Sequence, residues 1–205
     1  MATCRVHILG ASGSGTTTLG RTLALALAVP HHDSDDYFWE PTDPPYSRPR
    51  PAEERLRLME ALFVPRPAWV LSGSLCGWGD PLIPSLDLVV FLQTATRDRI
   101  ERLRRREAVR YGAEATAPGG PNHERTAAFL EWAAGYDDGD LAGRSLRRHE
   151  AWLATLPCPV LRLDGGRPRA ELAAAVMARL RPDRVTAPDP GARSPLPIDD
   201  GVPPA

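Results

Sequence analysis

The sequence contains no lysine, because all 25 basic residues among its 205 residues are arginine. They are balanced by 26 acidic residues, and a net charge of −1 gives no general attraction to nucleic acid or to an anionic membrane. The three cysteines, Cys4, Cys76 and Cys158, are too widely spaced for a zinc motif or a disulfide framework, which indicates a reducing compartment. No apolar run reaches the roughly 18 residues that a membrane span needs, and the N-terminus lacks a secretory pattern. We therefore expect a cytoplasmic protein with no membrane contact, for which nucleic acid is an unlikely partner.

The length of the chain suits one domain with a real core and is too short for two ordinary domains. The composition changes near Pro182: seven of the last 24 residues are proline, and large apolar residues are sparse. Such a segment cannot bury enough surface to offset the entropy of ordering it. We expect a domain over residues 1–181 and a disordered tail over 182–205, with an extended arm lying on the domain as the alternative for the tail.

Short apolar runs alternate with amphipathic ones along the domain. Strands are predicted at residues 5–9, 69–71, 86–92 and 159–163, and helices at 17–29, 97–110 and 168–180. The inward side of the first helix is expected to carry Leu19, Leu23, Ala26 and Leu27, and that of the second Ile100, Leu103 and Val109. Strands that alternate with helices predict an α/β domain with a parallel sheet.

A glycine-rich loop at residues 10–17, GASGSGTT, lies between the first strand and the first helix. It matches the phosphate-loop pattern G-x-x-x-x-G-K-[ST] except that Thr16 stands at the lysine position. Glycines let the backbone N–H groups point inward, and the following helix adds the positive end of its dipole. The Thr17 hydroxyl stands where the Mg²⁺ of a nucleotide binds. We therefore expect ATP and Mg²⁺ as cofactors, against the alternative of an ordinary strand-to-helix turn. The expected contacts to the nucleotide are Gly10, Ala11, Ser12, Gly13, Ser14, Gly15, Thr16, Thr17 and Thr18.

The missing lysine bears directly on catalysis. In phosphate-loop kinases this lysine reaches the β- and γ-phosphates and stabilises charge during transfer. Drift from lysine to arginine would have left arginine at position 16, whereas the sequence has threonine. Either an arginine from elsewhere takes the role, or the protein binds nucleotide without turning it over.

Six segments carry a resemblance to a known group of proteins: HILGASGSGTTTLG, HHDSDDYFW, WVLSGSLCGWGD, DLVVFLQT, RLRRREAVRYG and LRLDG, in this order. The chain resembles the small phosphate-loop kinases of the adenylate kinase, shikimate kinase and gluconate kinase group, and bacterial proteins labelled adenylate kinase-like or AAA-family ATPase. The resemblance covers about residues 3–181. It implies a five-stranded parallel sheet in the order 2-3-1-4-5, ATP at the carboxyl ends of the strands, and a mobile, arginine-bearing helical lid at about residues 104–148.

The acidic turn after the first helix contains Asp33 and Asp35, which look like the D-x-D of shikimate kinase. The resemblance implies that Asp33 lies near the metal and that Asp35 orients the acceptor hydroxyl. Oxygen ligands suit Mg²⁺, and a carboxylate can accept the hydroxyl proton. The alternative is that these acids solvate a turn or cap the next helix. Adenylate kinases carry an aspartate where this chain has Ser72, and this difference places more of the metal role on Asp33. Gly73 and Ser74 are candidate acceptor contacts, with a plain turn as the alternative.

The segment 97–110 holds seven arginines and three acidic residues. It could be a solvated helix, a nucleic-acid patch or a lid helix whose arginines clamp phosphates. A strand precedes this segment, and Tyr111 and a Gly/Pro stretch follow it. This order matches the lid region of the resembled family. Arg106 and Arg110 lie four residues apart on one helical face, and with Arg144 they are our candidates for catalytic phosphate contacts.

The aromatic segment at residues 37–39 leads into a proline-rich loop that either covers the acceptor or forms a satellite cluster. Arg48 and Arg50 could then bind an anionic acceptor. Neighbouring His31 and His32 do not form a metal motif, because adjacent strand residues point to opposite faces. Four further aromatic residues are expected to serve packing: Phe129, Trp132, Tyr136 and Trp152.

These observations predict a kinase that transfers the γ-phosphoryl group of ATP to a small acceptor, either a nucleotide, a nucleoside or a small hydroxylated metabolite. The alternative is a nucleotide-binding protein without kinase activity, which Thr16 favours. A nucleic-acid-associated protein is the third interpretation, and the balanced charge disfavours it. The chain is expected to be a monomer or a homodimer.

Overall fold

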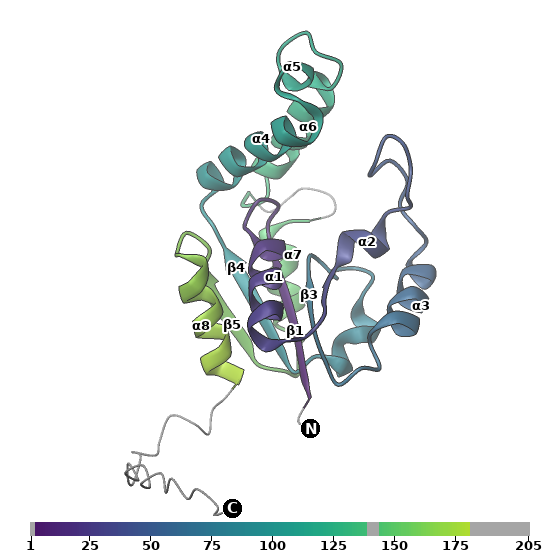
Figure 1. The fold of residues 1–205 in the computed structure, drawn as a ribbon, viewed down its shortest axis with the longest axis vertical. Helices are drawn as coiled ribbons and strands as arrows, with labels where there is room; N and C mark the ends of the chain where they lie inside the picture. The colour runs from purple at the N-terminus through teal and green to yellow at the C-terminus, as the bar shows by residue number, and fades with distance from the viewer. Residues whose placement is uncertain (1–2, 139–143, 181–205) are drawn as a thin grey trace, which may run out of the picture.

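The computed structural model describes residues 3–138 and 144–180, so the predicted tail at 182–205 lies outside the described residues. Five parallel strands form one sheet: β1 (Cys4–Gly10), β2 (His31–Asp33), β3 (Ala68–Ser72), β4 (Leu88–Gln93) and β5 (Val160–Asp164). Their spatial order is β2-β3-β1-β4-β5, which confirms the predicted fold class and strand order (Figure 1). Because all strands run the same way, their carboxyl ends meet at one edge of the sheet.

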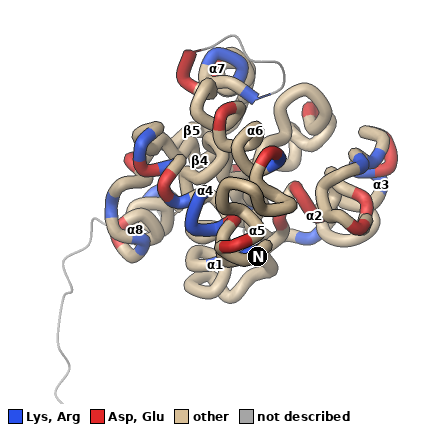
Figure 2. Tube along the Cα trace, turned by 90° about the horizontal axis from the view of Figure 1, so that it is seen from above, with Lys and Arg blue, Asp and Glu red and all other residues tan. Residues whose placement is uncertain are grey.

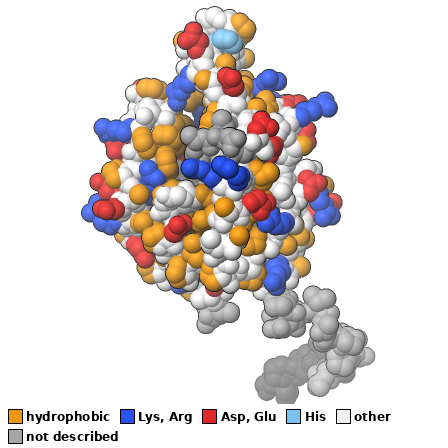
Figure 3. Space-filling model, turned by 180° about the vertical axis from the view of Figure 1, so that it is seen from behind, with side chains coloured by type: hydrophobic (Ala, Val, Ile, Leu, Met, Phe, Trp, Pro, Cys, Tyr) orange, Lys and Arg blue, Asp and Glu red, His pale blue; other side chains and the backbone are white. Residues whose placement is uncertain are grey.

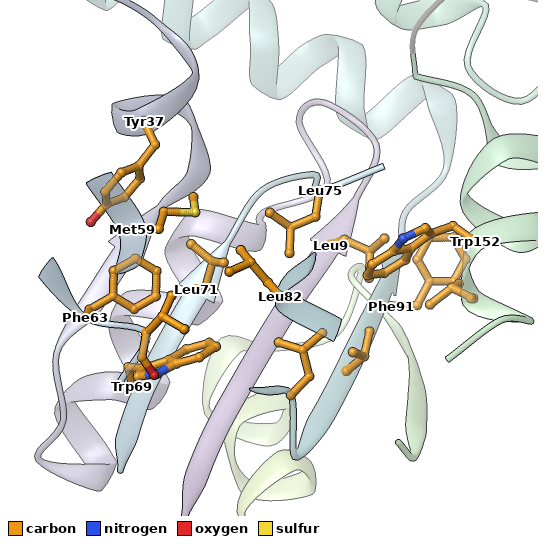
Figure 4. Packing of buried hydrophobic residues seen from close by; sticks show 14 residues of the cluster. Leu9, Tyr37, Met59, Phe63, Trp69, Leu71, Leu75, Leu82, Phe91 and Trp152 are labelled. Atoms are coloured by element: carbon orange, nitrogen blue, oxygen red, sulfur yellow. The ribbon is translucent and has the colours of Figure 1, made fainter. Parts of the chain in front are cut away.

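Helices cover both faces of the sheet, as parallel strands require. On one face α1 (Thr16–Leu27) and α8 (Arg169–Leu180) pack on apolar residues of β1, β3 and β4. The other face is covered by α3 (Ala52–Leu62), the 3-10 helix η1 (Asp80–Ser85) and α7 (Leu146–Leu153). In Figure 4, Met59, Phe63 and Trp69 lie at one end of the core on this face and Phe91 and Trp152 at the other, with leucines between them.

Three helices project beyond the carboxyl edge of the sheet: α4 (Thr96–Tyr111), α5 (Ala113–Thr116) and α6 (His123–Ala134) (Figure 1). α5 and α6 lie within the predicted lid at 104–148, whereas α4 begins at Thr96, before it. The mobility of that segment stays a prediction. α2 (Ser34–Phe38) leads into residues 39–50, which we call the arm. The arm folds back on itself through a bridge between Trp39 and Pro49 and a 3.0 Å hydrogen bond from Glu40 N to Arg48 O.

Two predicted inward faces are partly wrong. In α4 the buried residues are Arg99, Leu103 and Glu107, spaced four apart, while the Val109 side chain is 88% exposed. In α1 the Ala26 side chain is exposed as well. Burial follows the helical repeat rather than residue polarity, because the charged groups on that stripe find partners.

Arg99 is the clearest case, with a fully buried side chain. Its guanidinium donates to Asp137 Oδ2 at 2.8 Å, Ala133 O at 2.9 Å and Thr94 O at 3.1 Å. It also reaches Ser12 O at 3.5 Å. The residue therefore ties the glycine-rich loop to the end of β4 and the end of α6.

Basic and acidic residues are interspersed along the trace in Figure 2 and over the face that Figure 3 shows. Among the residues described, no helix combines the length and apolar character that crossing a bilayer demands.

Candidate functional site

A cavity of about 900 Å³ lies at the carboxyl edge of the sheet, between the glycine-rich loop, α2, the arm and the α4–α6 helices. Twelve of the predicted site residues line it: Ala11, Ser12, Gly13, Gly15, Thr16, Thr17, Thr18, Asp33, Asp35, Arg106, Arg110 and Arg144. Two predicted nucleotide contacts, Gly10 and Ser14, do not line the cavity; both are buried. The fold thus brings together candidate groups that lie more than 130 positions apart in the sequence.

The glycine-rich loop has the backbone that its sequence predicts. Gly13 and Gly15 have φ values of +81° and +100°, a region that only glycine occupies without strain. A Cβ on Gly13 would lie 2.7 Å from Arg99 O. The N-cap of α1 is Gly15, which has no side chain to cap the helix. The N–H groups of the first helical turn are therefore left for an anion in the cavity.

The loop is held from below by groups that the sequence did not single out. Ser14 O accepts hydrogen bonds from Thr94 Oγ1 and from Arg102 Nη1, each at 3.2 Å. Arg102 Nη2 also donates to Gly165 O at 3.1 Å, which joins the loop after β5 to the same guanidinium. One arginine among seven on a helix gives no sequence signal of this kind, because its partners are backbone carbonyls from distant segments.

A chain of hydrogen bonds connects α1, β2 and β3. Thr17 Oγ1 donates to Asp33 Oδ2 at 2.7 Å, and Ser72 Oγ donates to the same oxygen at 3.2 Å. His31 Nε2 lies 3.0 Å from Ser72 Oγ, and burial lowers the pKa of His31. The other oxygen of Asp33 accepts from Asp35 N at 3.1 Å and caps α2. Asp33 therefore caps α2 and also faces the cavity. Its expected place near the metal and the helix-capping alternative are thus compatible.

These oxygens suit a magnesium ion that arrives with a nucleotide. Mg²⁺ is commonly held by one or two protein oxygens together with substrate phosphates, and the Thr17 hydroxyl and the Asp33 carboxylate lie side by side. Within residues 3–138 and 144–180 no cluster of three or more His, Cys, Asp or Glu residues forms a cage for a metal. The hydroxyl of Thr17 and the carboxylate of Asp33 fit a metal that is shared with phosphates.

Asp35 faces the cavity, and protein surrounds it closely enough to change its ionisation. Asp35 is exposed at the surface of the cavity, but the surrounding walls partly desolvate its carboxyl and raise its pKa, while the positive charge of Arg144 and, to a smaller extent, of Arg106 lowers it. The neighbouring carboxylate of Asp33 raises it further. Two of the predicted arginines are therefore close enough to act on the predicted acceptor-side carboxylate.

The three predicted arginines have different partners. Arg106 Nε donates to Glu107 Oε1 at 3.0 Å, and Arg110 Nη1 lies 3.6 Å from the same oxygen. Arg144 Nη1 instead donates to Ser12 Oγ at 3.4 Å. Two arginines thus share one carboxylate on α4, whereas the third contacts the glycine-rich loop.

Aromatic rings form the outer walls of the cavity. Trp39 and Tyr46 on the arm meet with ring centroids 6.0 Å apart, and the Arg110 guanidinium lies 4.9 Å from the Tyr46 ring. Phe129 and Trp132 of α6 line the cavity, although the sequence assigned them to packing. Tyr136 and Trp152 are buried as predicted.

The arginines predicted to bind an acceptor do not line the cavity. Arg48 pairs with Glu40, and Arg50 donates to the carbonyls of Tyr37 and Trp39. Both stabilise the fold of the arm. The cavity-lining arginine on this side is Arg125 of α6, whose Nη2 donates to Pro45 O at 2.6 Å.

Ser74, a candidate acceptor contact, belongs to the core instead. Its hydroxyl lies 3.1 Å from His149 Nε2, and Tyr136 Oη lies 2.7 Å from His149 Nδ1. Burial lowers the pKa of His149 to about 3, so the imidazole is neutral in the folded protein. Gly73 does line the cavity, with a φ of +108°, and a Cβ there would lie 1.9 Å from Ser34 Oγ.

No known protein-family model matches the chain. The chain is 46% identical over 159 residues to the uncharacterized protein YqaC of Bacillus subtilis (strain 168), covering 78% of this chain and 87% of that protein. It is similar in structure to shikimate kinase from Acinetobacter baumannii in complex with shikimate, with a TM-score of 0.50, 16% identity and coverage of 90% of this chain and 96% of that one. Shikimate kinase from Bacteroides thetaiotaomicron gives a TM-score of 0.50 at 16% identity, over 87% and 98% of the two chains. At this identity the likeness shows the phosphate-loop kinase fold alone.

Proposed function

We propose that this chain, which belongs to the same family as Bacillus subtilis YqaC, transfers the γ-phosphoryl group of ATP to a small hydroxylated acceptor. The observation that carries the proposal is the hydrogen bond between Thr17 and Asp33, which joins the glycine-rich loop to the acidic turn on the wall of one cavity. A loop suited to phosphates and an acidic turn that also carries Asp35, the candidate for the acceptor side, thus share one space.

On the nucleotide side, the glycine-rich loop would hold the phosphates through its backbone N–H groups and the N-terminus of α1. Thr17 and Asp33 would hold Mg²⁺, which neutralises phosphate charge when it is bound. Phosphoryl transfer asks the protein mainly for positioning and for stabilisation of charge. The hydroxyl and carboxylate of this pair are fixed by their mutual hydrogen bond before any ligand arrives.

On the acceptor side, Asp35 would orient the attacking hydroxyl and accept its proton. The acceptor oxygen forms a bond to the γ-phosphorus while the bond from that phosphorus to the bridging oxygen of ADP breaks. The electron pair of the broken bond leaves on ADP. Around this centre the aromatic walls and Arg110 suit a small acceptor, and shikimate, the ligand of the Acinetobacter protein, is an example of that size class.

A second candidate is a nucleotide-binding protein without turnover. Thr16 favours it, because this residue lines the cavity at the position where a phosphate-loop lysine would stand, and the chain has no lysine to replace it. Both candidates require magnesium-dependent nucleotide binding, and only the first requires transfer.

The test is a calorimetric titration of the purified protein with ATP, with and without Mg²⁺, followed by transfer of labelled γ-phosphate to a panel of nucleotides, nucleosides and small hydroxy acids. Magnesium-dependent binding in the micromolar range together with a labelled product supports the kinase. The same binding without any labelled product supports the second candidate. No binding up to millimolar ATP contradicts both.

A further inference from the structure

We infer that Arg144 takes the place of the lysine that a phosphate loop ordinarily carries at the position of Thr16. The inference rests on the proposed function, because it assigns a residue to the γ-phosphate of the same site. It selects one arginine among the six that line the cavity, which are Arg21, Arg102, Arg106, Arg110, Arg125 and Arg144.

Four of the other five arginines already have partners that hold them elsewhere. Arg102 donates to two backbone carbonyls beneath the glycine-rich loop. Arg106 and Arg110 share the buried carboxylate of Glu107. Arg125 donates to the carbonyl of Pro45 on the arm. In each case a contact with a phosphate would compete with an existing bond.

Arg21 lies one turn after Thr17 on α1, on the side of β2 and α2. Its side chain is exposed. Among the contacts of the described residues, none is a hydrogen bond between Arg21 and the glycine-rich loop.

Arg144 differs because its guanidinium reaches the apex of the loop. Nη1 donates to Ser12 Oγ at 3.4 Å, a neutral hydroxyl that a phosphate oxygen can replace at small cost. Asp35 lines the same cavity as Ser12 and Arg144. Arg144 thus contacts the phosphate-binding loop inside the space that also holds the acceptor-side carboxylate, which is the space that the transferred group crosses.

The position of Arg144 is fixed by α7 and not by the glycine-rich loop. Ser145, the next residue, is fully buried and caps α7 by accepting Arg148 N at 3.3 Å. Leu146 N donates to Tyr136 O at 2.9 Å. These contacts anchor the backbone beside Arg144 in the core. The guanidinium of Arg144 therefore reaches the glycine-rich loop from a different segment of the chain.

A guanidinium suits this role chemically. It stays charged at all accessible pH values and presents its N–H groups in a planar fork that matches phosphate oxygens. As the bond from the γ-phosphorus to ADP breaks and the bond to the acceptor oxygen forms, with the acceptor proton passing to Asp35, Arg144 stabilises the charge on the equatorial oxygens. This is the contribution that the lysine makes in an ordinary phosphate loop.

The experiment is a cycle of four proteins: wild type, Arg144→Met, Thr16→Lys and the double variant. Two readouts are taken, the ratio of ATP to ADP affinity by calorimetry and the rate of phosphate transfer. Arg105→Met is the matched control, because Arg105 is an exposed arginine of α4 that pairs with Glu101 and does not line the cavity. Arg144→Lys tests whether a conservative change preserves the function.

We expect Arg144→Met to lower the preference for ATP over ADP about tenfold and the transfer rate by at least about 10²-fold, as removal of a transition-state donor does. Thr16→Lys should raise both by a much larger factor in the Arg144→Met background than in wild type. Arg105→Met should change neither. Arg144→Lys should fall between wild type and Arg144→Met.

The inference is overturned if Arg144→Met keeps the wild-type ATP preference, or if Thr16→Lys changes wild type and Arg144→Met by the same factor. Failure of the proposed function has a different signature: wild type transfers no phosphate to any acceptor, while the loss of ATP preference in Arg144→Met and its rescue by Thr16→Lys remain. That result would retain Arg144 as the γ-phosphate ligand of a protein that does not turn over.

Discussion

The hydroxyl of Thr17 lies 2.7 Å from Oδ2 of Asp33, and this hydrogen bond joins the first turn of α1 to the end of β2. The two residues are 16 positions apart, and the sheet order brings them together because β2 and β1 flank β3. Ser72 at the end of β3 donates to the same carboxylate oxygen. The first turn of α1 and the ends of β2 and β3 therefore meet at this oxygen.

Thr17→Val should remove the magnesium dependence of ATP binding, because valine keeps the volume of threonine and loses the oxygen. Calorimetric titrations of the variant with and without Mg²⁺ should give the same affinity within about twofold, an allowance of roughly 0.4 kcal/mol. Thr17→Ser should retain the dependence. Thr22→Val is the matched control, since the Thr22 hydroxyl donates to the Thr18 carbonyl on the same helix. Persistence of a strong magnesium effect in Thr17→Val would contradict the assignment.

Asp35 should set the acid limb of the pH–rate profile. The ionised carboxylate is the form that accepts a proton, and desolvation by the cavity walls raises the pKa of Asp35 above the ordinary value of 3.8. Activity should therefore fall as the pH drops, beginning at a higher pH than that ordinary aspartate pKa would give. Arg106→Met should move this limb to still higher pH, because the Arg106 charge lowers the pKa.

The measurement is kcat/KM against pH for wild type, Arg106→Met and Asp35→Asn. Asp35→Asn should reduce kcat/KM by about 10²–10⁴-fold, the usual contribution of a general base. A limb that stays in place when the Arg106 charge is removed would count against Asp35 as the titrating group.

His149 should make the fold sensitive to acid. The folded imidazole has a pKa of about 3, whereas the unfolded chain has the ordinary value of 6.5. The unfolded state therefore binds more protons below pH 6.5, and the free energy of unfolding falls as the pH drops from about 6.5 towards 3. Well above pH 6.5 this group adds no pH dependence to the free energy of unfolding.

Urea unfolding of wild type and His149→Gln at pH 7 and pH 5 checks this expectation. Between these pH values wild type should lose about 2 kcal/mol more than the variant, since each pH unit well below the unfolded pKa costs about 1.4 kcal/mol. Equal losses in the two proteins would show that His149 is not kept neutral by the fold.

Arg99→Met should destabilise the protein by about 3 kcal/mol. The change removes the donors to the carbonyls of Thr94 and Ala133 and leaves Asp137 without its ion pair. Arg97→Met, at an exposed position two residues earlier on the same helix, should stay within about 0.5 kcal/mol of wild type in the same urea titration. Similar midpoints for the two variants would mean that the buried contacts of Arg99 contribute little.

The parts of the fold that could be predicted are those whose signal is local. The apolar runs gave the strands at 5–9 and 86–92 to within two residues at each end, and the glycine spacing predicted the loop at 10–17. Chain periodicity also predicted α4, which begins at Thr96 and ends at Tyr111. In each of these cases neighbouring residues carry the whole pattern.

The parts that could not be predicted depend on distant partners. Arg99 is buried and Val109 is exposed because α4 meets Ser12, Thr94 and Ala133, and no periodicity of apolar residues records those contacts. Arg50 holds the arm through backbone carbonyls, which carry no sequence signature. The choice among many arginines therefore needed the three-dimensional structure, while the existence of an anion-binding loop did not.

The contact between Arg125 and the carbonyl of Pro45 has a consequence for the affinity of any anion that binds Arg125. The arm uses an N–H group of an arginine that lines the cavity, so it acts as an intramolecular competitor of any anion that seeks the same group. Its local concentration is set by the fold and does not change on dilution. An observed dissociation constant for a ligand of Arg125 is then the intrinsic constant divided by the fraction of molecules in which the arm does not accept the Arg125 hydrogen bond.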